Sequence, residues 1–202
     1  MRDVSSKFTG RVGTTSNPRS VAPIITSNVL KDERTISFTC ISRYAAAKAV
    51  HAAAIANTKN PQRTGAFILP TIAPDVKPEG GSISKGMTPF RITVFSEDRP
   101  TGPSSDAIRH TRRTRVSASV DHEELAQNIH LSYMKKTPLI LECMGDKAMG
   151  IVTQAIAIFN ERVQAHDMTT FVQIVSGKAP DGADITKMEF QLVERPKNSV
   201  SE

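Results

Sequence analysis

The sequence has no tryptophan, only two tyrosines and only two cysteines in 202 residues. Two cysteines are too few for the disulfide framework of a small secreted domain. No apolar run reaches the roughly 18 residues of a membrane-spanning helix, and the N-terminus lacks the apolar stretch of a signal peptide. We therefore expect a cytoplasmic protein with no membrane partner.

Catalytic and metal-binding motifs are also missing. His122 and the two glutamates after it have no second histidine at the metalloprotease spacing, and residues 84–86 and 176–178 lack the glycine-rich frame of a phosphate loop. Cys40 and Cys143 lie among apolar neighbours without an adjacent histidine, which favours buried reduced thiols over a disulfide or metal site. We predict no enzyme activity, no metal and no cofactor.

Charge is present but unevenly distributed. The formal net charge is +6, with +10 in residues 1–115 and −4 in residues 116–202. A basic half favours a polyanionic partner, RNA or DNA, and an acidic half argues against a uniform coating of positive charge. The alternative is that the basic half only keeps the protein soluble.

One stretch of the chain occurs twice, as residues 35–57 and 138–160. At a constant offset of 103 positions, Cys40 matches Cys143 and Asn57 matches Asn160. Each copy reads as an apolar strand, a short turn and a helix rich in small residues, and such self-similarity indicates a duplicated unit.

The elements around each copy recur in the same order. In the first unit we expect strands at 7–12, 35–41, 65–72 and 89–95, with helices at about 17–30 and 45–57. In the second we expect strands at 115–119, 139–144, 170–175 and 187–194, with helices at 121–135 and 148–163. The resulting division is unit 1 at 7–97 (basic), a Pro/Ser/Arg linker at 98–114, and unit 2 at 115–197 (acidic).

The first unit resembles the stage V sporulation protein S family, whose members have an Alba-like fold. The resemblance covers residues 7–95 and lies in Arg11-Val12, in the helix opening Ser16 to Ala22, in Val29-Leu30 and in the second helix at 48–56. Residues 45–50, Ala-Ala-Ala-Lys-Ala-Val, are similar to the turn and helix of Alba proteins themselves. The second unit is similar more faintly.

This resemblance implies an α+β fold: two Alba-like β-α-β-α-β-β units, each a four-stranded mixed sheet with two helices on one face. It also implies binding of DNA or RNA and a homo-oligomer. The turn before the second helix departs from the family, because Alba proteins have glycine where this chain has Ser42, Arg43 and Tyr44. In the second unit the turn is Gly145-Asp146-Lys147, where Asp146 opposes a phosphate.

Cations and one aromatic residue at defined places form the candidate nucleic-acid contacts. At a strand-to-helix turn, free N–H groups favour anions and a tyrosine can stack on a base. The alternatives are solvated cations and a tyrosine at the core edge, or, for the hairpin arm, a dimerisation device. The candidates are Arg11 and Arg19 near the first helix; Arg43, Tyr44 and Lys48 at the second; Lys77, Lys85 and Arg91 around the hairpin arm; Arg109, Arg112, Arg113 and Arg115 in and after the linker; and Lys147 in unit 2.

The sequence thus favours a nucleic-acid-binding protein of low sequence specificity, with RNA or single strands slightly preferred to duplex DNA because the tyrosine and the arm suit stacking better than groove reading. Chaperoning or regulating transcripts, or compacting nucleic acid, are roles compatible with this reading. The alternative is a structural or regulatory oligomerisation protein whose charge is incidental.

Overall fold

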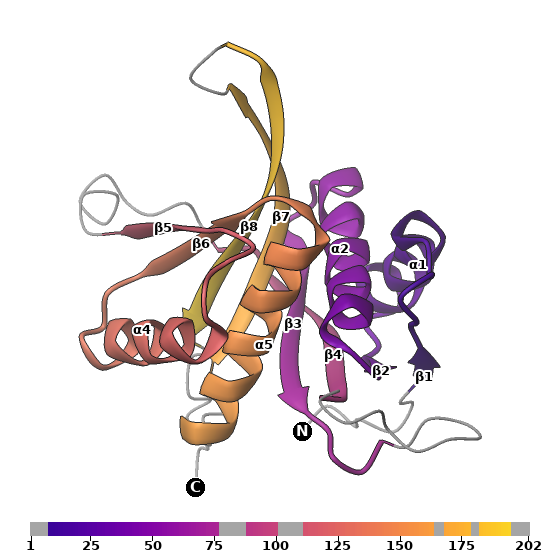
Figure 1. Cartoon of the computed structure of the whole chain (residues 1–202). Coiled ribbons are helices and arrows are strands. Elements are labelled where there is room, and N and C mark those ends of the chain that lie inside the picture. The colour runs from indigo at the N-terminus through magenta and orange to yellow at the C-terminus, as the bar shows by residue number, and fades with distance from the viewer. Residues whose placement is uncertain (1–7, 77–87, 101–110, 164–167, 179–181, 195–202) are drawn as a thin grey trace, which may run out of the picture.

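The structure, a computed structural model, describes residues 8–76, 88–100, 111–163, 168–178 and 182–194. In this part of the chain the fold is α+β, as expected: eight strands form one mixed sheet and the helices cover one of its faces (Figure 1). The elements are β1 (Phe8–Arg11), α1 (Pro18–Ile25), its π-helical continuation η1 (Thr26–Lys31), β2 (Ile36–Cys40), α2 (Arg43–Lys59), β3 (Thr64–Ile72), β4 (Phe90–Asp98), β5 (Arg112–Val116), α4 (His122–Met134), β6 (Leu139–Cys143), α5 (Gly145–Val163), β7 (Met168–Lys178) and β8 (Asp184–Glu194).

The strand order is β1-β2-β4-β3-β7-β8-β6-β5. The pairs β1–β2 and β5–β6 are parallel, and all other pairs are antiparallel. The expected four-stranded sheets are therefore not separate, because β3 and β7 join them at Phe67↔Phe171 and Ile68↔Thr170.

Two buried asparagines reinforce this short β3–β7 junction. Asn57, near the end of α2, donates to the carbonyl oxygens of Ala66 in β3 (2.9 Å) and Val172 in β7 (2.7 Å), and its side-chain oxygen accepts from the Ala66 N–H. Asn160, near the end of α5, donates to the Pro70 carbonyl in β3 (2.9 Å). The two asparagines that match in the repeated stretch thus each bond a strand of the other half.

The core lies between the sheet and the helices, and small side chains bring α2 and α5 close together. In α2, the side chains of Ala45, Ala46 and Ala49 are 0% exposed. In α5, a Cβ on Gly150 would lie 3.0 Å from the Arg43 carbonyl oxygen. Glycine at this position therefore permits the backbone contact between the two helices.

The largest departure from the sequence prediction concerns the linker. Residues 97 and 98 continue β4, and residues 112–114 belong to β5, which begins at Arg112 and not at 115. The register explains the difference, because Arg112 to Val116 pair in parallel with Leu139 to Cys143, so backbone pairing extends the strand into a sequence with the composition of a loop. Strands β7 and β8 are likewise longer than expected, since they pair with each other out to Lys178 and Asp184.

Both cysteines are free and buried, as the sequence predicts, and burial raises the pKa of each thiol to about 12. Because the thiolate is the reactive form, we expect neither thiol to react with a disulfide reagent in the native protein at pH 8, and both to react once urea unfolds the chain. A spectrophotometric thiol count measures this. Rapid reaction of either thiol under native conditions would contradict the buried positions.

Among the described residues, no helix combines the length and apolar character needed to cross a membrane.

Candidate nucleic-acid interface

The turn between β2 and α2 presents a cation and an aromatic ring together. Ser42 caps the helix, its hydroxyl oxygen accepting from the Ala45 N–H (3.2 Å), so α2 begins at Arg43, two residues earlier than predicted. Tyr44 is 39% exposed, and the Arg43 guanidinium carbon lies 5.4 Å from the centre of its ring. This cation–π contact keeps the two side chains side by side at the surface.

The matching turn between β6 and α5 lies next to it. Gly145 has φ +78°, a conformation that glycine adopts without strain, and Lys147 follows as an exposed cation. The Lys48 ammonium in α2 forms an ion pair with Asp146. Together with the contact of Arg43 and Gly150, this pair places both turns on one surface.

Arg19, in the first turn of α1, reaches the same region. The pKa of His51 in α2 is lowered, first by burial and further by Lys48 and Arg19, while Asp146 acts in the opposite direction. Arg19 therefore lies within electrostatic range of His51. We call Arg19, Arg43, Tyr44, Lys48, Asp146 and Lys147 together the double-turn surface, within which the Lys48 ammonium pairs with the Asp146 carboxylate.

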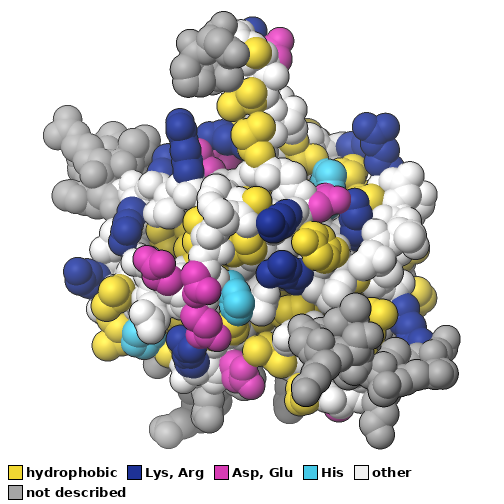
Figure 2. Space-filling model, in the orientation of Figure 1, with side chains coloured by type: hydrophobic (Ala, Val, Ile, Leu, Met, Phe, Trp, Pro, Cys, Tyr) yellow, Lys and Arg dark blue, Asp and Glu magenta, His cyan; other side chains and the backbone are white. Residues whose placement is uncertain are grey.

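Figure 2 shows the helix-covered face, on which Lys and Arg side chains lie near the middle beside hydrophobic side chains and acidic side chains gather toward the lower left. The first turn of α4 contributes acidic residues, Glu123 and Glu124, after the N-cap Asp121. Positive charge on this face is therefore local, in agreement with the charge asymmetry of the sequence.

A cleft of about 340 Å³ adjoins the double-turn surface, between the two halves of the molecule. Gln154 from α5 and His122 from α4 line it, and sequence reasoning did not select them as binding residues. No sequence motif indicates either residue, because the cleft forms only when the first half of the chain, which supplies the other wall, packs against them. The complete lining is Ser42, Arg43, Tyr44, Thr88, Phe90, His122 and Gln154.

A second group of the predicted cations belongs to the strands. Arg11 in β1 and Arg91 in β4 both pair with Thr39 of β2, so they occupy one cross-strand row. Arg91 also forms an ion pair of 2.7 Å with Asp75. Arg112 and Arg115 are exposed on the edge strand β5.

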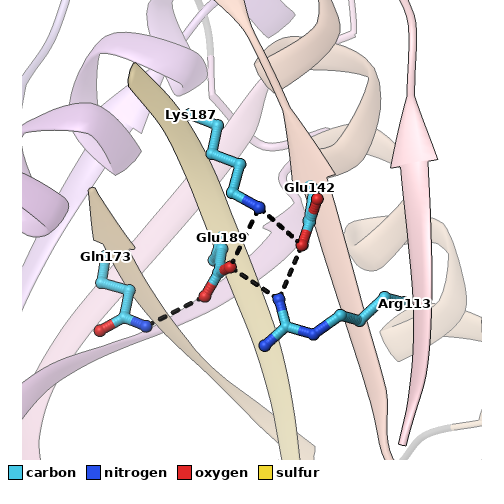
Figure 3. Close-up of polar contacts among 5 residues, drawn as sticks. All are labelled: Arg113, Glu142, Gln173, Lys187 and Glu189. Carbon is cyan, nitrogen blue, oxygen red and sulfur yellow. Dashed lines mark hydrogen bonds and ion pairs between the residues drawn. The ribbon is translucent and has the colours of Figure 1, made fainter. Parts of the chain in front are cut away.

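Arg113, although half-exposed, forms two ion pairs with strand residues. It donates to Glu142 in β6 (2.7 Å) and to Glu189 in β8 (2.8 Å), two carboxylate side chains that are 9% and 8% exposed (Figure 3). The Lys187 ammonium lies 2.9 Å from the same oxygen of Glu142, and Gln173 donates to Glu189 (3.1 Å). Arg113 thus belongs to strand β5, where it binds these two carboxylates, and its predicted contact with phosphate stays a prediction.

Arg99 is another residue that sequence reasoning missed. It donates to the carbonyl oxygens of Asn57 (2.7 Å) and Asn60 (2.5 Å) at the end of α2, and its guanidinium lies over the Phe171 ring of β7. Burial lowers its pKa. An arginine in a segment of loop composition thus links the first half to the second, and no local pattern indicates that role.

Lys77, Lys85 and Arg109 lie outside the described residues. Within the described ranges, no three His, Cys, Asp or Glu residues are grouped as metal ligands would be. A scan of protein-family models and a search of curated proteins both found no match to this chain.

Proposed function

We propose that this protein is a non-enzymatic nucleic-acid-binding protein of low sequence specificity that slightly favours RNA or single strands over duplex DNA. We further propose that it consists of two Alba-like units of four strands and two helices each. The observation that carries the proposal is the double-turn surface, where the turn before α2 presents Arg43 beside the Tyr44 ring, the turn before α5 presents the exposed Lys147, and the Lys48–Asp146 ion pair joins the two turns.

The repeated pairing pattern supports the two units. β1-β2-β4-β3 and β5-β6-β8-β7 have the same succession of parallel and antiparallel neighbours. Cys40 and Cys143 are the last residues of corresponding strands, and Asn57 and Asn160 bond across the junction in both directions. One chain would then correspond to a pair of single units.

The contacts sort the predicted cations into two groups. Arg43, Lys147 and Arg19 have no ion pair within the described structure and can meet a phosphate. Lys48 is neutralised by Asp146 and acts by holding the two turns together, and Arg113 is held by Glu142 and Glu189. Low specificity follows because α2 and α5 are packed against the sheet and each other, so neither can enter a major groove as a recognition helix.

The test is binding of labelled RNA, single-stranded DNA and duplex DNA across a range of salt concentrations. Affinity should fall as salt rises. The substitution Arg43→Glu should weaken binding about tenfold and lower the slope of log K against log salt by about 1, because one phosphate contact is lost.

Arg63→Glu is the matched control, because Arg63 belongs to the same basic half and its side chain is 88% exposed, beyond the far end of α2. This variant should bind nearly as the parent does. Equal loss in both variants would show that binding depends on overall charge and not on the double-turn surface. Absence of binding at low salt would refute the function itself. With no tryptophan in the chain, co-purified nucleic acid would also dominate the ultraviolet spectrum.

The alternative, self-association, has one observation in its favour. Beyond their contacts with β3 and β6, β7 and β8 continue as a two-stranded ribbon that projects from the sheet (Figure 1). Its apolar residues Ile174, Val175 and Ile185 are only partly buried, and an isolated two-stranded ribbon is marginally stable in water. Sedimentation of the purified protein over a range of concentrations distinguishes a monomer from an oligomer.

A further inference from the structure

We propose that the cleft between the two halves receives one unpaired nucleotide, with the base inside the cleft against Tyr44 and the phosphate at its mouth on Arg43. This inference rests on the proposed nucleic-acid binding and adds to it the chemical class that is recognised. With such a site the protein recognises unpaired bases, whereas contacts to phosphate alone would not distinguish single strands from duplex.

The size of the cleft favours a single nucleotide. Its volume of about 340 Å³ lies at the low end of the range of roughly 300–1,000 Å³ for small-molecule sites. Such a volume suits one base with its sugar and is too small for a base pair. A nucleotide within a duplex would have to leave the helix to enter, which costs unstacking and unpairing free energy.

The lining combines an aromatic ring with neutral hydrogen-bonding groups. Tyr44 offers a stacking surface, and the fully buried Phe90 supplies an apolar wall. The side chains of His122 and Gln154 make no hydrogen bond to any other described residue, so both have donors and acceptors available for the edge of a base. These groups match the chemistry of a nucleobase.

The charges orient the nucleotide. Arg43 is the cation among the lining residues, and its contact with the Tyr44 ring places it at the stacking surface. At the His122 wall of the cleft, the Asp121 carboxylate lies close enough to His122 for the two charges to interact. A phosphate beside His122 would meet the Asp121 carboxylate, so we place the phosphate at Arg43 and the base at His122 and Gln154.

The cleft also explains why the two turns differ. At the offset of 103 positions, Tyr44 corresponds to Lys147, and Gln154 corresponds to His51. The second turn thus carries a cation where the first carries the ring. Its acidic residue, Asp146, is bound to Lys48. Only the first turn therefore has the aromatic ring for a base, and we infer one nucleotide site per chain at this junction.

The experiment uses the full chain and a short single-stranded oligonucleotide that contains 2-aminopurine, with the same strand in a duplex for comparison. At one fixed low salt concentration, the single strand should bind about tenfold more tightly than the duplex, and the probe's fluorescence should fall as it stacks. Millimolar AMP should displace the strand, whereas inorganic phosphate at the same concentration should not.

Tyr44→Ala and Gln154→Leu should each reduce single-strand affinity, the first by about tenfold, and leave duplex affinity nearly unchanged. Gln127→Leu is the matched control, because Gln127 is exposed on α4 and does not line this cleft. Tyr44 is itself partly exposed, so its substitution tests the site even where Gln154→Leu alters folding.

Equal affinity for single strand and duplex, or unchanged single-strand binding by Tyr44→Ala, would overturn the nucleotide site. Displacement by phosphate as effective as that by AMP would do the same, since it would show an anion site without base recognition. In each case, salt-dependent binding that is still weakened by Arg43→Glu would leave the proposed function standing. Absence of any nucleic-acid binding would refute both the nucleotide site and the proposed function.

Discussion

Replacing Asn57 with alanine is expected to lower the free energy of unfolding by about 3 kcal/mol. The side chain is 1% exposed and makes three hydrogen bonds, two with Ala66 and one with Val172. Truncation would leave the Ala66 N–H and the two carbonyl oxygens with fewer partners where water does not readily reach, and each unsatisfied group costs roughly 1–3 kcal/mol. Some relaxation of the strands offsets part of this cost.

Asn160 provides an internal comparison. It occupies the matching position in the repeat, but it makes one hydrogen bond, to Pro70, and its side-chain oxygen has no hydrogen-bond partner among the described residues. Asn160→Ala should therefore cost about 1 kcal/mol, clearly less than Asn57→Ala. The difference arises because Pro70 has no N–H to offer, whereas Ala66 both donates and accepts.

Urea unfolding followed by circular dichroism measures both effects. Thr58→Ala is the control, because the exposed Thr58 hydroxyl donates only within its own helix, to the Ala54 carbonyl, and it should change stability by less than about 0.5 kcal/mol. If Asn57→Ala is no more damaging than Thr58→Ala, the asparagine does not hold the junction of the two halves.

Replacing Arg113 with methionine is expected to cost about 2 kcal/mol at neutral pH. Removing one partner of a buried ion pair typically costs about 3–5 kcal/mol, and the value is reduced here because the Arg113 side chain is 53% exposed. Glu142 and Glu189 would keep Lys187 as their remaining cation. Two nearly buried carboxylates would then share one positive charge.

The cost should depend on pH in a defined direction. Burial acts to raise the pKa of Glu142, but hydrogen bonds from Lys187 and Arg113 outweigh it, so the pKa lies below the ordinary value of 4.5. A carboxylate with a lowered pKa contributes stability above the unfolded value, and that contribution disappears as the pH falls through the folded pKa. The difference between parent and Arg113→Met should therefore be largest above pH 4.5 and shrink below it.

Urea unfolding at a series of pH values tests this expectation. Arg115→Met is the control, because Arg115 lies two positions further along β5 and forms no ion pair with a described residue. A stability difference that is independent of pH would mean that Arg113 contributes through packing of its side chain and not through the two carboxylates. Nucleic-acid affinity, in contrast, should change little in Arg113→Met.

Local sequence determined most of the secondary structure. Asp121 caps α4 by accepting from the N–H groups of Glu123 and Glu124, and the pattern of cap and acidic first turn predicts that start correctly. The alternation of Phe90, Ile92 and Val94 predicts the face of β4 that is buried, since alternate side chains of a strand point to opposite faces. These features depend on residues a few positions apart.

Local sequence predicted less well where strand pairing extends an element. Residues 112–114 have the composition of a linker, and only their pairing with β6 makes them a strand. The start of α5 was predicted three residues late, because Gly145 reads as part of a turn although the helix begins there. In both cases a neighbouring strand or a backbone conformation, which composition does not report, set the boundary.

The sequence by itself determined the α+β class, the cysteines as buried thiols, and the positions of the cations along the chain. The tertiary structure decided which of those cations form ion pairs within the protein. Lys48 forms an ion pair with Asp146, 98 positions away in the sequence, and Arg113 forms one with Glu189, 76 positions away. Arg43 instead contacts the ring of its neighbour Tyr44. The physical reason is that a charged side chain is neutralised by oppositely charged groups close to it in space. Folding brings those groups together from distant parts of the chain.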